Sequence, residues 1–376
     1  MRLSQNRLAV NHVLTKRINQ IFNMKSDGYL INHVMSKDVE SGIFSAIMKY
    51  FKEYSPNWVR HEVSILPIEG AAIHHYHRPH LEKKLVSNSV CTVHHDLDDP
   101  DVWHSKPRFL PRYMEAAGVI CLNQTQKQIL YADGIAEDQL YVVPHGYNDK
   151  VLRLRSNINT GAASDKVNLG IASRRYARRV KGEAYLSELV KRLDPDLFSF
   201  TFVGQDRSID AIAFRRLGFE VTVFERLPYR VFQSYYEAID ALLMCSSHEG
   251  GPANIPEAIA TGTPVLSSPI GMAKDLIRHG HNGMFLTLDP QTDADMINSL
   301  CEDNRASLNA LKRRSLSKAS SALTWRQSVE GNLRAYSNIL GTDLLKPPTI
   351  ESENFDREIS IKNESSALEP EAMVAA

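Results

Sequence analysis

The sequence predicts an α/β protein made of two doubly wound domains, each with a parallel sheet. The chain has 376 residues, which is long for one domain and sufficient for two. Short apolar, β-branched runs alternate with helical stretches along both halves, and this alternation is typical of parallel sheets. The expected strands are 29–34, 63–67, 72–75, 90–94, 118–122 and 140–143 in the first half, and 167–172, 198–203, 221–224, 241–244, 264–266 and 284–288 in the second.

A polar stretch separates the two series of strands. Residues 153–165 (RLRSNINTGAASD) contain Asn, Ser, Thr and Gly and no apolar periodicity, so they are interpreted as a linker. The linker divides the chain into an N-terminal domain, residues 1–152, and a C-terminal domain, residues 166–325.

The two ends of the chain lie outside these series. Residues 1–27 are expected to form an extra helix with apolar and basic faces. Packing on its own domain is the favoured interpretation of this helix, and contact with a membrane surface is the alternative. Residues 326–342 are expected to be helical, and 343–376, rich in Glu, Ser, Pro and Asn, are expected to be disordered.

Composition excludes several classes of protein. With 43% hydrophobic and 23% charged residues the chain is typical of a soluble globular protein. Its formal net charge is zero, so no nucleic-acid partner is expected. The four cysteines form no CxxC pair, and no segment has the length of a membrane span or the pattern of a signal peptide. A cytoplasmic protein is therefore expected, with peripheral contact at the inner face of the membrane as the alternative for its N-terminal helix.

The most informative segment runs from Ser246 to Gly271 (SSHEGGPANIPEAIATGTPVLSSPIG). Glu249 and Glu257 flank a glycine-rich turn that lies between the expected strand 241–244 and a helix-forming stretch at 255–260. Such a turn presents backbone N–H groups and the positive end of a helix dipole, while carboxylates accept hydrogen bonds from sugar hydroxyls. The segment therefore predicts a site for a polyhydroxylated, negatively charged ligand.

This segment resembles the Glu-x7-Glu signature of the retaining, nucleotide-sugar-dependent glycosyltransferases of group 1 (GT4), which have the GT-B fold. The matching residues are Glu249-Gly250-Gly251-Pro252, Glu257-Ala258, Thr261-Gly262-Thr263-Pro264-Val265, Gly271 and Asn282-Gly283. The resemblance implies two Rossmann-like domains that face each other across a cleft, with the late helix crossing back to the first domain. It also implies a nucleotide-sugar donor, a glycan, lipid-linked or other hydroxyl acceptor, as in polysaccharide biosynthesis, and no required metal or other cofactor.

The resemblance also assigns roles to donor-side residues. Glu249 would contact hydroxyls of the transferred sugar, and Glu257 those of the ribose. In the loop 173–182, Lys181 and either Arg174 or Arg175 would bind the diphosphate, with Arg175 at the commoner spacing. The remaining donor contacts would be Gly204, Gly250, Gly251, Pro252, Ala253 and Asn254.

The first domain is rich in histidine. Thr92-Val93-His94 matches a histidine that the family places beside the anomeric carbon of the donor, so His94 joins Glu249, Arg175 and Lys181 in the expected catalytic set. On the acceptor side the candidates are His75, His77 and Gly42.

Two alternatives remain open. A metal-dependent hydrolase could use His75 and His77 together with the acidic cluster Asp96, Asp98, Asp99 and Asp101. A protein that binds nucleotide sugar without catalysis is the other. Neither the donor sugar and its base, nor the acceptor, nor the oligomeric state follows from these residues.

Overall fold

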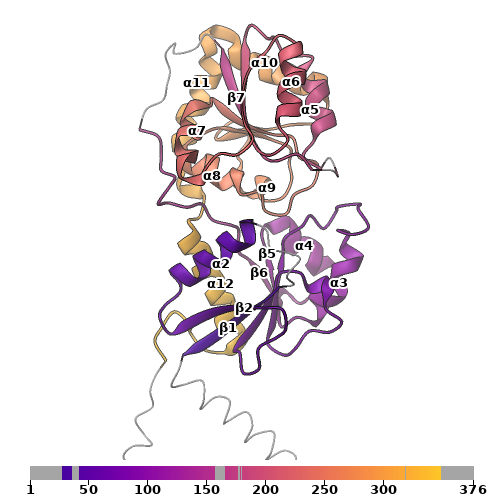
Figure 1. The fold of residues 1–376 in the computed structure, drawn as a ribbon, viewed down its shortest axis with the longest axis vertical. Coiled ribbons are helices and arrows are strands. Elements are labelled where there is room, and N and C mark those ends of the chain that lie inside the picture. Colours follow the sequence, from indigo (N-terminus) through magenta and orange to yellow (C-terminus); the bar gives the residue numbers. More distant parts are fainter. Residues whose placement is uncertain are drawn as a thin grey trace, which may run out of the picture.

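The computed structural model describes residues 28–35, 42–156, 166–176, 178, 180–317 and 319–348. They form two lobes stacked along the long axis of the molecule, each with a six-stranded parallel sheet (Figure 1). The two doubly wound domains predicted from the sequence are therefore confirmed.

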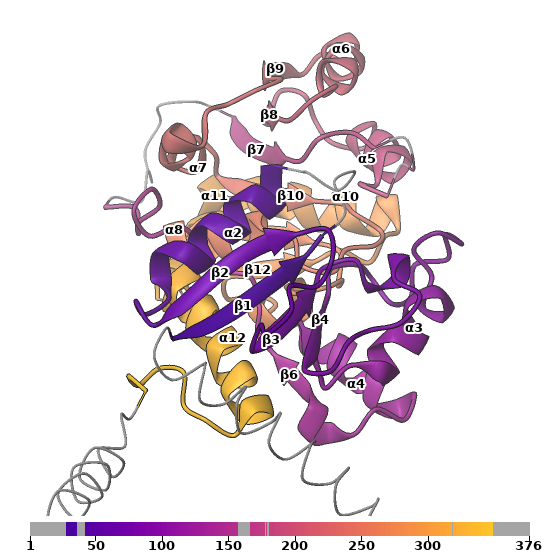
Figure 2. The ribbon, with the colours of Figure 1, turned by 60° about the horizontal axis from the view of Figure 1, so that its bottom comes forward.

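The first lobe has the strand order β2-β1-β3-β4-β5-β6. Its strands are β1 (Tyr29–Val34), β2 (Val59–Ser64), β3 (Ile73–Tyr76), β4 (Ser89–Val93), β5 (Gly118–Cys121) and β6 (Leu140–Val142). Its helices are α2 (Gly42–Tyr54), α3 (Lys106–Glu115), α4 (Gln124–Ala132), the late helix α12 (Trp325–Leu340), and the short 3₁₀ helices η2 (Pro79–Leu81) and η3 (Glu137–Gln139). Helices α2 and α12 lie on one side of the sheet, and α3 and α4 lie on the other (Figures 1 and 2).

The second lobe has the order β12-β11-β10-β7-β8-β9. Its strands are β7 (Val167–Ala172), β8 (Phe198–Val203), β9 (Glu220–Phe224), β10 (Ala241–Met244), β11 (Val265–Ser267) and β12 (Gly283–Phe285). Its helices are α5 (Glu183–Val190), α6 (Ser208–Arg216), α7 (Phe232–Ala238), α8 (Asn254–Thr261), α9 (Ala273–Leu276), α10 (Pro290–Asn298), α11 (Glu302–Leu316), and the 3₁₀ helices η4 (Tyr229–Val231), η5 (Ser299–Cys301) and η6 (Ala319–Ser321).

One expected strand lies earlier in the chain than predicted. The apolar run at 63–67 suggested a strand there, but β2 ends at Ser64. Val59 and His61 are buried and pair with β1, whereas Leu66 is 74% exposed. Only the first two residues of the apolar run, Val63 and Ser64, belong to β2, and the rest of the run follows the strand.

The late helix α12 belongs to the first lobe although it follows the second in sequence. It begins in a capping box at Thr324 and ends at Gly341, whose φ of 67° suits glycine. Val329 and Tyr336 are buried in the same hydrophobic core as Ile31 of β1. The chain therefore passes from the first lobe to the second and returns.

The segment after α12 is folded where it begins. Leu344 is fully buried in the core of the first lobe, and the indole N–H of Trp58 donates to its carbonyl oxygen at 2.9 Å. Disorder was expected from residue 343, so this expectation is wrong for 343–348. The expected helix 1–27, residues 157–165 of the linker, and 349–376 lie outside the described residues. Within the described part of the chain, no helix combines the length and apolar character that crossing a bilayer needs.

We predict that Leu344→Ala lowers the free energy of unfolding by about 2–4 kcal/mol, because it leaves a cavity in a packed core. Leu66→Ala is the matched control, since its side chain is exposed and its loss should change stability by less than about 0.5 kcal/mol. Urea denaturation measures both. Equal effects of the two substitutions would show that the segment around Leu344 does not pack as described.

Candidate active site

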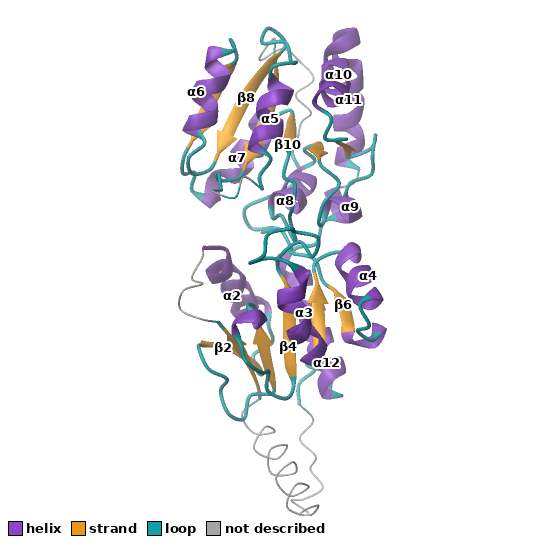
Figure 3. Ribbon diagram, turned by 90° about the vertical axis from the view of Figure 1, so that its right-hand side faces the viewer, coloured by secondary structure: helices purple, strands orange, loops and turns teal. Residues whose placement is uncertain are grey.

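A cavity of about 280 Å³ lies where the two lobes meet. Loops fill most of this region, because the parallel strands of each sheet end there and their connections face the opposite lobe (Figure 3). The first lobe contributes His77, Arg78, Thr92, His94, His95, Asp96, Asp99, His104 and Phe109 to the lining, and the second contributes Arg174, Tyr176, Arg178, Val180, Lys181, His248, Glu249 and Gly250. Both walls are therefore polar, and both carry charge.

The glycine turn predicted from the sequence lies in close contact with the first lobe. A Cβ atom on Gly250 would lie 2.7 Å from the carbonyl oxygen of His94, and one on Gly251 would lie 2.5 Å from Cδ1 of Leu122. The Asn123 side chain donates from Nδ2 to the Gly250 carbonyl at 2.9 Å. Glycine is required at position 250 because its backbone packs directly on the backbone of His94, whereas Gly251 faces side chains.

The rest of the turn leads into helix α8. Pro252 is buried, and Ala253 precedes the first residue of the helix. Asn254 donates from Nδ2 to the Ala172 carbonyl at 3.1 Å, which ties the helix start to the end of β7. The N-terminus of α8 thus lies at the end of the sheet that faces the first lobe.

Two more glycines hold the cationic loop 173–182 against the sheet. Gly182 has φ +76°, and a Cβ atom there would lie 1.8 Å from the Cys245 carbonyl oxygen. Gly204 has φ +147°, and its Cβ would lie 2.3 Å from the Ser173 carbonyl oxygen. Both positions need the left-handed backbone that glycine allows. Gly204 therefore packs against the backbone of the loop at Ser173 and does not line the cavity.

Lys181, expected to bind the diphosphate, and Glu249, expected to contact sugar hydroxyls, form an ion pair. Each side chain is only 16% exposed. The Ser246 hydroxyl also donates to Oε1 of Glu249 at 3.1 Å. The carboxylate is therefore oriented by two partners inside the cavity.

The two candidate arginines differ in their surroundings. Arg175 forms an ion pair with Asp210 of α6, and its backbone N–H donates to the Gln205 carbonyl at 3.0 Å. Arg174 lines the cavity, with its guanidinium carbon 4.1 Å from the ring centroid of Tyr176. Of the two, Arg174 lines the cavity and Arg175 does not.

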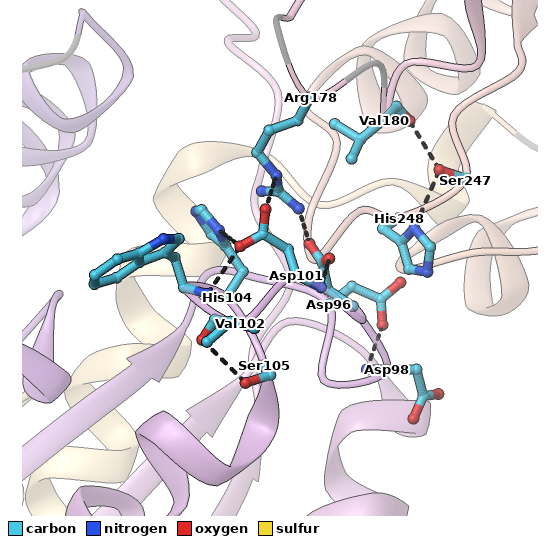
Figure 4. A network of polar contacts seen from close by, with 12 residues as sticks. Asp96, Asp98, Asp101, Val102, His104, Ser105, Arg178, Val180, Ser247 and His248 are labelled. Carbon is cyan, nitrogen blue, oxygen red and sulfur yellow. Dashed lines mark hydrogen bonds and ion pairs between the residues drawn. The ribbon is translucent and has the colours of Figure 1, made fainter. Parts of the chain in front are cut away.

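Arg178 joins the lobes through an ion pair that the sequence analysis did not identify. From the second lobe it reaches Asp101 of the first lobe, with Nε 3.0 Å from Oδ2 (Figure 4). It also contacts Asp99. The sequence shows the acidic cluster but gives no sign of its partner, because the two segments are far apart along the chain.

Glu257 lies apart from this cavity. Its Oε1 accepts from the Tyr229 hydroxyl at 2.8 Å and its Oε2 from the Tyr236 hydroxyl at 2.8 Å. Burial raises the pKa of Glu257 to about 7, although the two hydrogen bonds act in the opposite direction. Both oxygens expected to hold a ribose thus have tyrosine partners in this structure.

A row of four hydrogen-bonded imidazoles runs through the first lobe to His94. The Ser55 hydroxyl contacts His61 at 2.7 Å, and the row continues from His61 to His33 at 2.9 Å. His33 contacts His77 at 3.0 Å, and His77 contacts His94 at 3.0 Å. Since a neutral imidazole donates with one nitrogen and accepts with the other, each ring sets the tautomer of the next. The row therefore fixes the orientation of His94 at the cavity.

The other acceptor-side candidates lie elsewhere. His75 is buried, with its ring nitrogens hydrogen-bonded to the Tyr336 hydroxyl at 2.6 Å and the Thr92 hydroxyl at 2.7 Å. It does not line the cavity between the lobes. His77 does line it, and Gly42 is the first residue of α2.

The metal-hydrolase alternative finds little support in these contacts. Ring nitrogens of His33, His75 and His77 lie within 4.8 Å of one another, which is close enough for three ligands of one ion. However, both ring nitrogens of each are already hydrogen-bonded to side chains. Asp99 and Asp101 contact Arg178 instead of these histidines.

Comparison with known proteins identifies the fold. Residues 158–320 match the family model of group 1 glycosyl transferases. HepE from Anabaena, solved in complex with UDP and glucose, is 16% identical, with 82% of this chain and 99% of that chain covered and a TM-score of 0.63. The fold is GT-B.

Further solved structures agree with the GT-B assignment. Sucrose-phosphate synthase from Thermosynechococcus elongatus is 15% identical over 83% of this chain and 99% of its own, with a TM-score of 0.66. A glycosyltransferase from Rickettsia africae ESF-5 is 16% identical over 84% and 99%, with a TM-score of 0.63. No curated protein matches the sequence.

We predict that stability depends steeply on pH below 6.5. Burial lowers the pKa of His61 and of His77 to about 3, and it holds the pKa values of His33 and His75 well below 6.5. The unfolded chain binds protons near pH 6.5 while the folded chain does not, so this contribution to stability is present above pH 6.5 and lost as the pH falls. Each histidine contributes about 1.4 kcal/mol per pH unit, and these four contribute roughly 5 kcal/mol per unit.

Urea denaturation between pH 5 and 7.5 measures this slope. His61→Gln should reduce the slope of the unfolding free energy against pH by about 1.4 kcal/mol per pH unit, the contribution of one proton. Glutamine can still form hydrogen bonds with Ser55 and His33, but it does not titrate. His281→Gln is the control, since His281 is exposed. A free energy of unfolding that stays constant from pH 7 to pH 5 would contradict the neutral histidine row.

Proposed function

We propose that the protein is a retaining glycosyltransferase that moves a sugar from a nucleoside diphosphate sugar to a hydroxyl of a glycan, a lipid-linked sugar or another acceptor. One observation carries the proposal: Lys181, Arg174 and Glu249 meet in one cavity between two GT-B lobes, opposite His94. The match of the second lobe to the group 1 family model supports it.

The cations of the second lobe would stabilise the leaving group. Negative charge builds on the diphosphate as its bond to the sugar breaks, so positive groups aimed at it lower the barrier. Lys181 and Arg174 both line the cavity, and among the described residues Arg174 contacts no carboxylate. We propose that these two groups supply the positive charge, so that the reaction needs no metal ion.

Glu249 would exchange its partner when the donor binds. In the free protein its carboxylate pairs with Lys181. A bound diphosphate would take over Lys181, and the carboxylate could then accept two hydroxyls of the sugar. The imidazole of His94, oriented by the histidine row, would lie beside the anomeric carbon. The acceptor hydroxyl would attack this carbon on the face that the diphosphate leaves. A phosphate oxygen of the donor would take the proton of that hydroxyl. Orientation and fixed charge would supply most of the rate.

The nucleoside would lie near Glu257. For its ribose to reach this carboxylate, Tyr229 or Tyr236 must release one oxygen. Tyr229 is the better candidate to move, because it begins the short helix η4, whereas Tyr236 is fully buried in α7. We further propose a cytoplasmic enzyme, with residues 1–27 as the segment to test for peripheral membrane contact.

The direct test is turnover of a panel of nucleotide sugars, followed as release of nucleoside diphosphate. Lys181→Ala should lower kcat/KM by roughly 10²–10³-fold, as expected for one charged contact to a transition state. Lys191→Ala, at an exposed lysine of the same lobe, is the matched control. NMR of the glycoside product should show the donor's anomeric configuration. If no nucleotide sugar is turned over and no nucleoside diphosphate raises the melting temperature, the proposed function is wrong.

Glu249→Gln should have opposite effects on binding and on catalysis. It removes the negative charge that competes with a diphosphate for Lys181, so nucleoside diphosphate should bind several-fold more tightly. Sugar transfer should slow by at least tenfold, because the neutral amide accepts weaker hydrogen bonds from the sugar hydroxyls than a carboxylate does. Calorimetry and steady-state rates measure the two effects. Weaker binding of the nucleoside diphosphate would contradict the proposed exchange of partners.

A further inference from the structure

Arg78 is a cation on the wall of the cavity with no acidic partner. It follows β3 directly after His77 and precedes η2. Its guanidinium carbon lies 5.4 Å from the ring centroid of Phe44, and its Nε is buried without a hydrogen-bond partner. Among the described residues no carboxylate pairs with it, and partial burial lowers the pKa of its guanidinium from the ordinary value.

The two fully buried arginines in the described part of the chain have partners. Arg207, 1% exposed, binds Asp210 and the Ser173 hydroxyl. Arg155, 7% exposed, donates to the Thr263 hydroxyl at 2.6 Å. An arginine stays charged in proteins, so a desolvated guanidinium without an acceptor is costly. The Nε of Arg155 also lacks a partner, but Arg155 and Arg207 both donate through their terminal nitrogens. Among the described residues the Arg78 side chain makes no hydrogen bond, and Arg78 faces a cavity.

His95 supplies a second unused polar atom on the same wall. Its Nε2 is buried and has no hydrogen-bond partner. The ring is held in place by Phe109, whose centroid lies 3.8 Å away. Arg78 and His95 both line the cavity from the first lobe, whereas Arg174 and Lys181 line it from the second. Each wall therefore presents a cation to the cavity, and the wall of Arg78 adds the His95 ring nitrogen, which donates in the tautomer that carries its proton on Nε2.

We propose that Arg78 and His95 form a binding site for an anionic group, a phosphate or a carboxylate, on the acceptor substrate. The inference rests on the proposed function, since it names the class of acceptor for that reaction. The two negative charges of an esterified diphosphate are matched by Lys181 and Arg174, which leaves the first-lobe arginine for the other substrate. A planar guanidinium suits phosphate and carboxylate equally, because both present two oxygens in one plane.

Binding can be tested without knowing the acceptor. The protein is saturated with a nucleoside diphosphate, and its melting temperature is followed on addition of orthophosphate, glucose 6-phosphate, glucuronate or glucose. The anionic probes should raise the melting temperature of the wild type and glucose should not; a phosphate site and a carboxylate site are told apart by which probe acts. Arg78→Gln should abolish the shift, and Arg108→Gln, at an exposed arginine of the same lobe, should retain it. Equal shifts in the wild type and Arg78→Gln would overturn the proposal.

The same variants separate this inference from the proposed function. Arg78→Gln should leave the melting temperature of the free protein unchanged or higher, because it removes an unpaired charge, and should leave the affinity for nucleoside diphosphate unchanged. It should raise KM for anionic acceptors by at least tenfold and leave KM for neutral acceptors the same, with Arg78→Lys in between. A loss of nucleoside diphosphate affinity like that of Lys181→Ala would place Arg78 at the donor and overturn the inference alone. Absence of any turnover would refute the function, and the binding experiment would still decide whether the anion site exists.

Discussion

The close approach of backbone at Gly250 and Gly251 is the constraint on which the site depends. At Gly250 no side chain fits between the turn and the backbone of His94, so the two lobes meet there at main-chain distance, and Gly251 lies against the Leu122 side chain. That distance lets Asn123 bond across the gap and brings Lys181 and Glu249 opposite His94. With any larger residue in the turn, the groups on the two walls would face each other across water, where charge interactions are weak.

The cavity between the lobes contains two kinds of cation: those paired with a carboxylate and those without a carboxylate partner. Lys181 and Arg178 are neutralised by carboxylates, the first within its own lobe and the second across the gap. Arg174 and Arg78 have no such partner in the described part of the chain. A paired cation must release its protein carboxylate before it binds an anionic ligand. An unpaired cation can bind such a ligand without breaking an ion pair. A cavity with both kinds suits a reaction that joins two substrates, at least one of them anionic.

The sequence predicted most of the fold because buried parallel strands are continuous apolar runs, and such runs are visible locally. It misplaced β2 because the run at 63–67 is exposed in the structure.

Less of the site could be predicted. The sequence could not show which of Arg174 and Arg175 lines the cavity, because that depends on the position of Asp210, the distant partner of Arg175. His33 and His61 carried no signal, because their contact follows from the register of β1 against β2 and not from any spacing. The tyrosine partners of Glu257 were missed because they lie 28 and 21 residues before it, in other helices, and no spacing rule connects them.

The path of the chain has a consequence for how the protein is made. The core of the first lobe contains Val329, Tyr336 and Leu344, and a buried hydrogen bond joins His75 to Tyr336. On the ribosome, the first 150 or so residues emerge roughly ten seconds or more before these partners are synthesised. During that interval the nascent first lobe exposes the groove that α12 will fill, while the second lobe can already close its own core. The lobe that begins the chain is therefore the last to be completed, and a protein shortened before α12 would leave the tunnel with that groove open to chaperones.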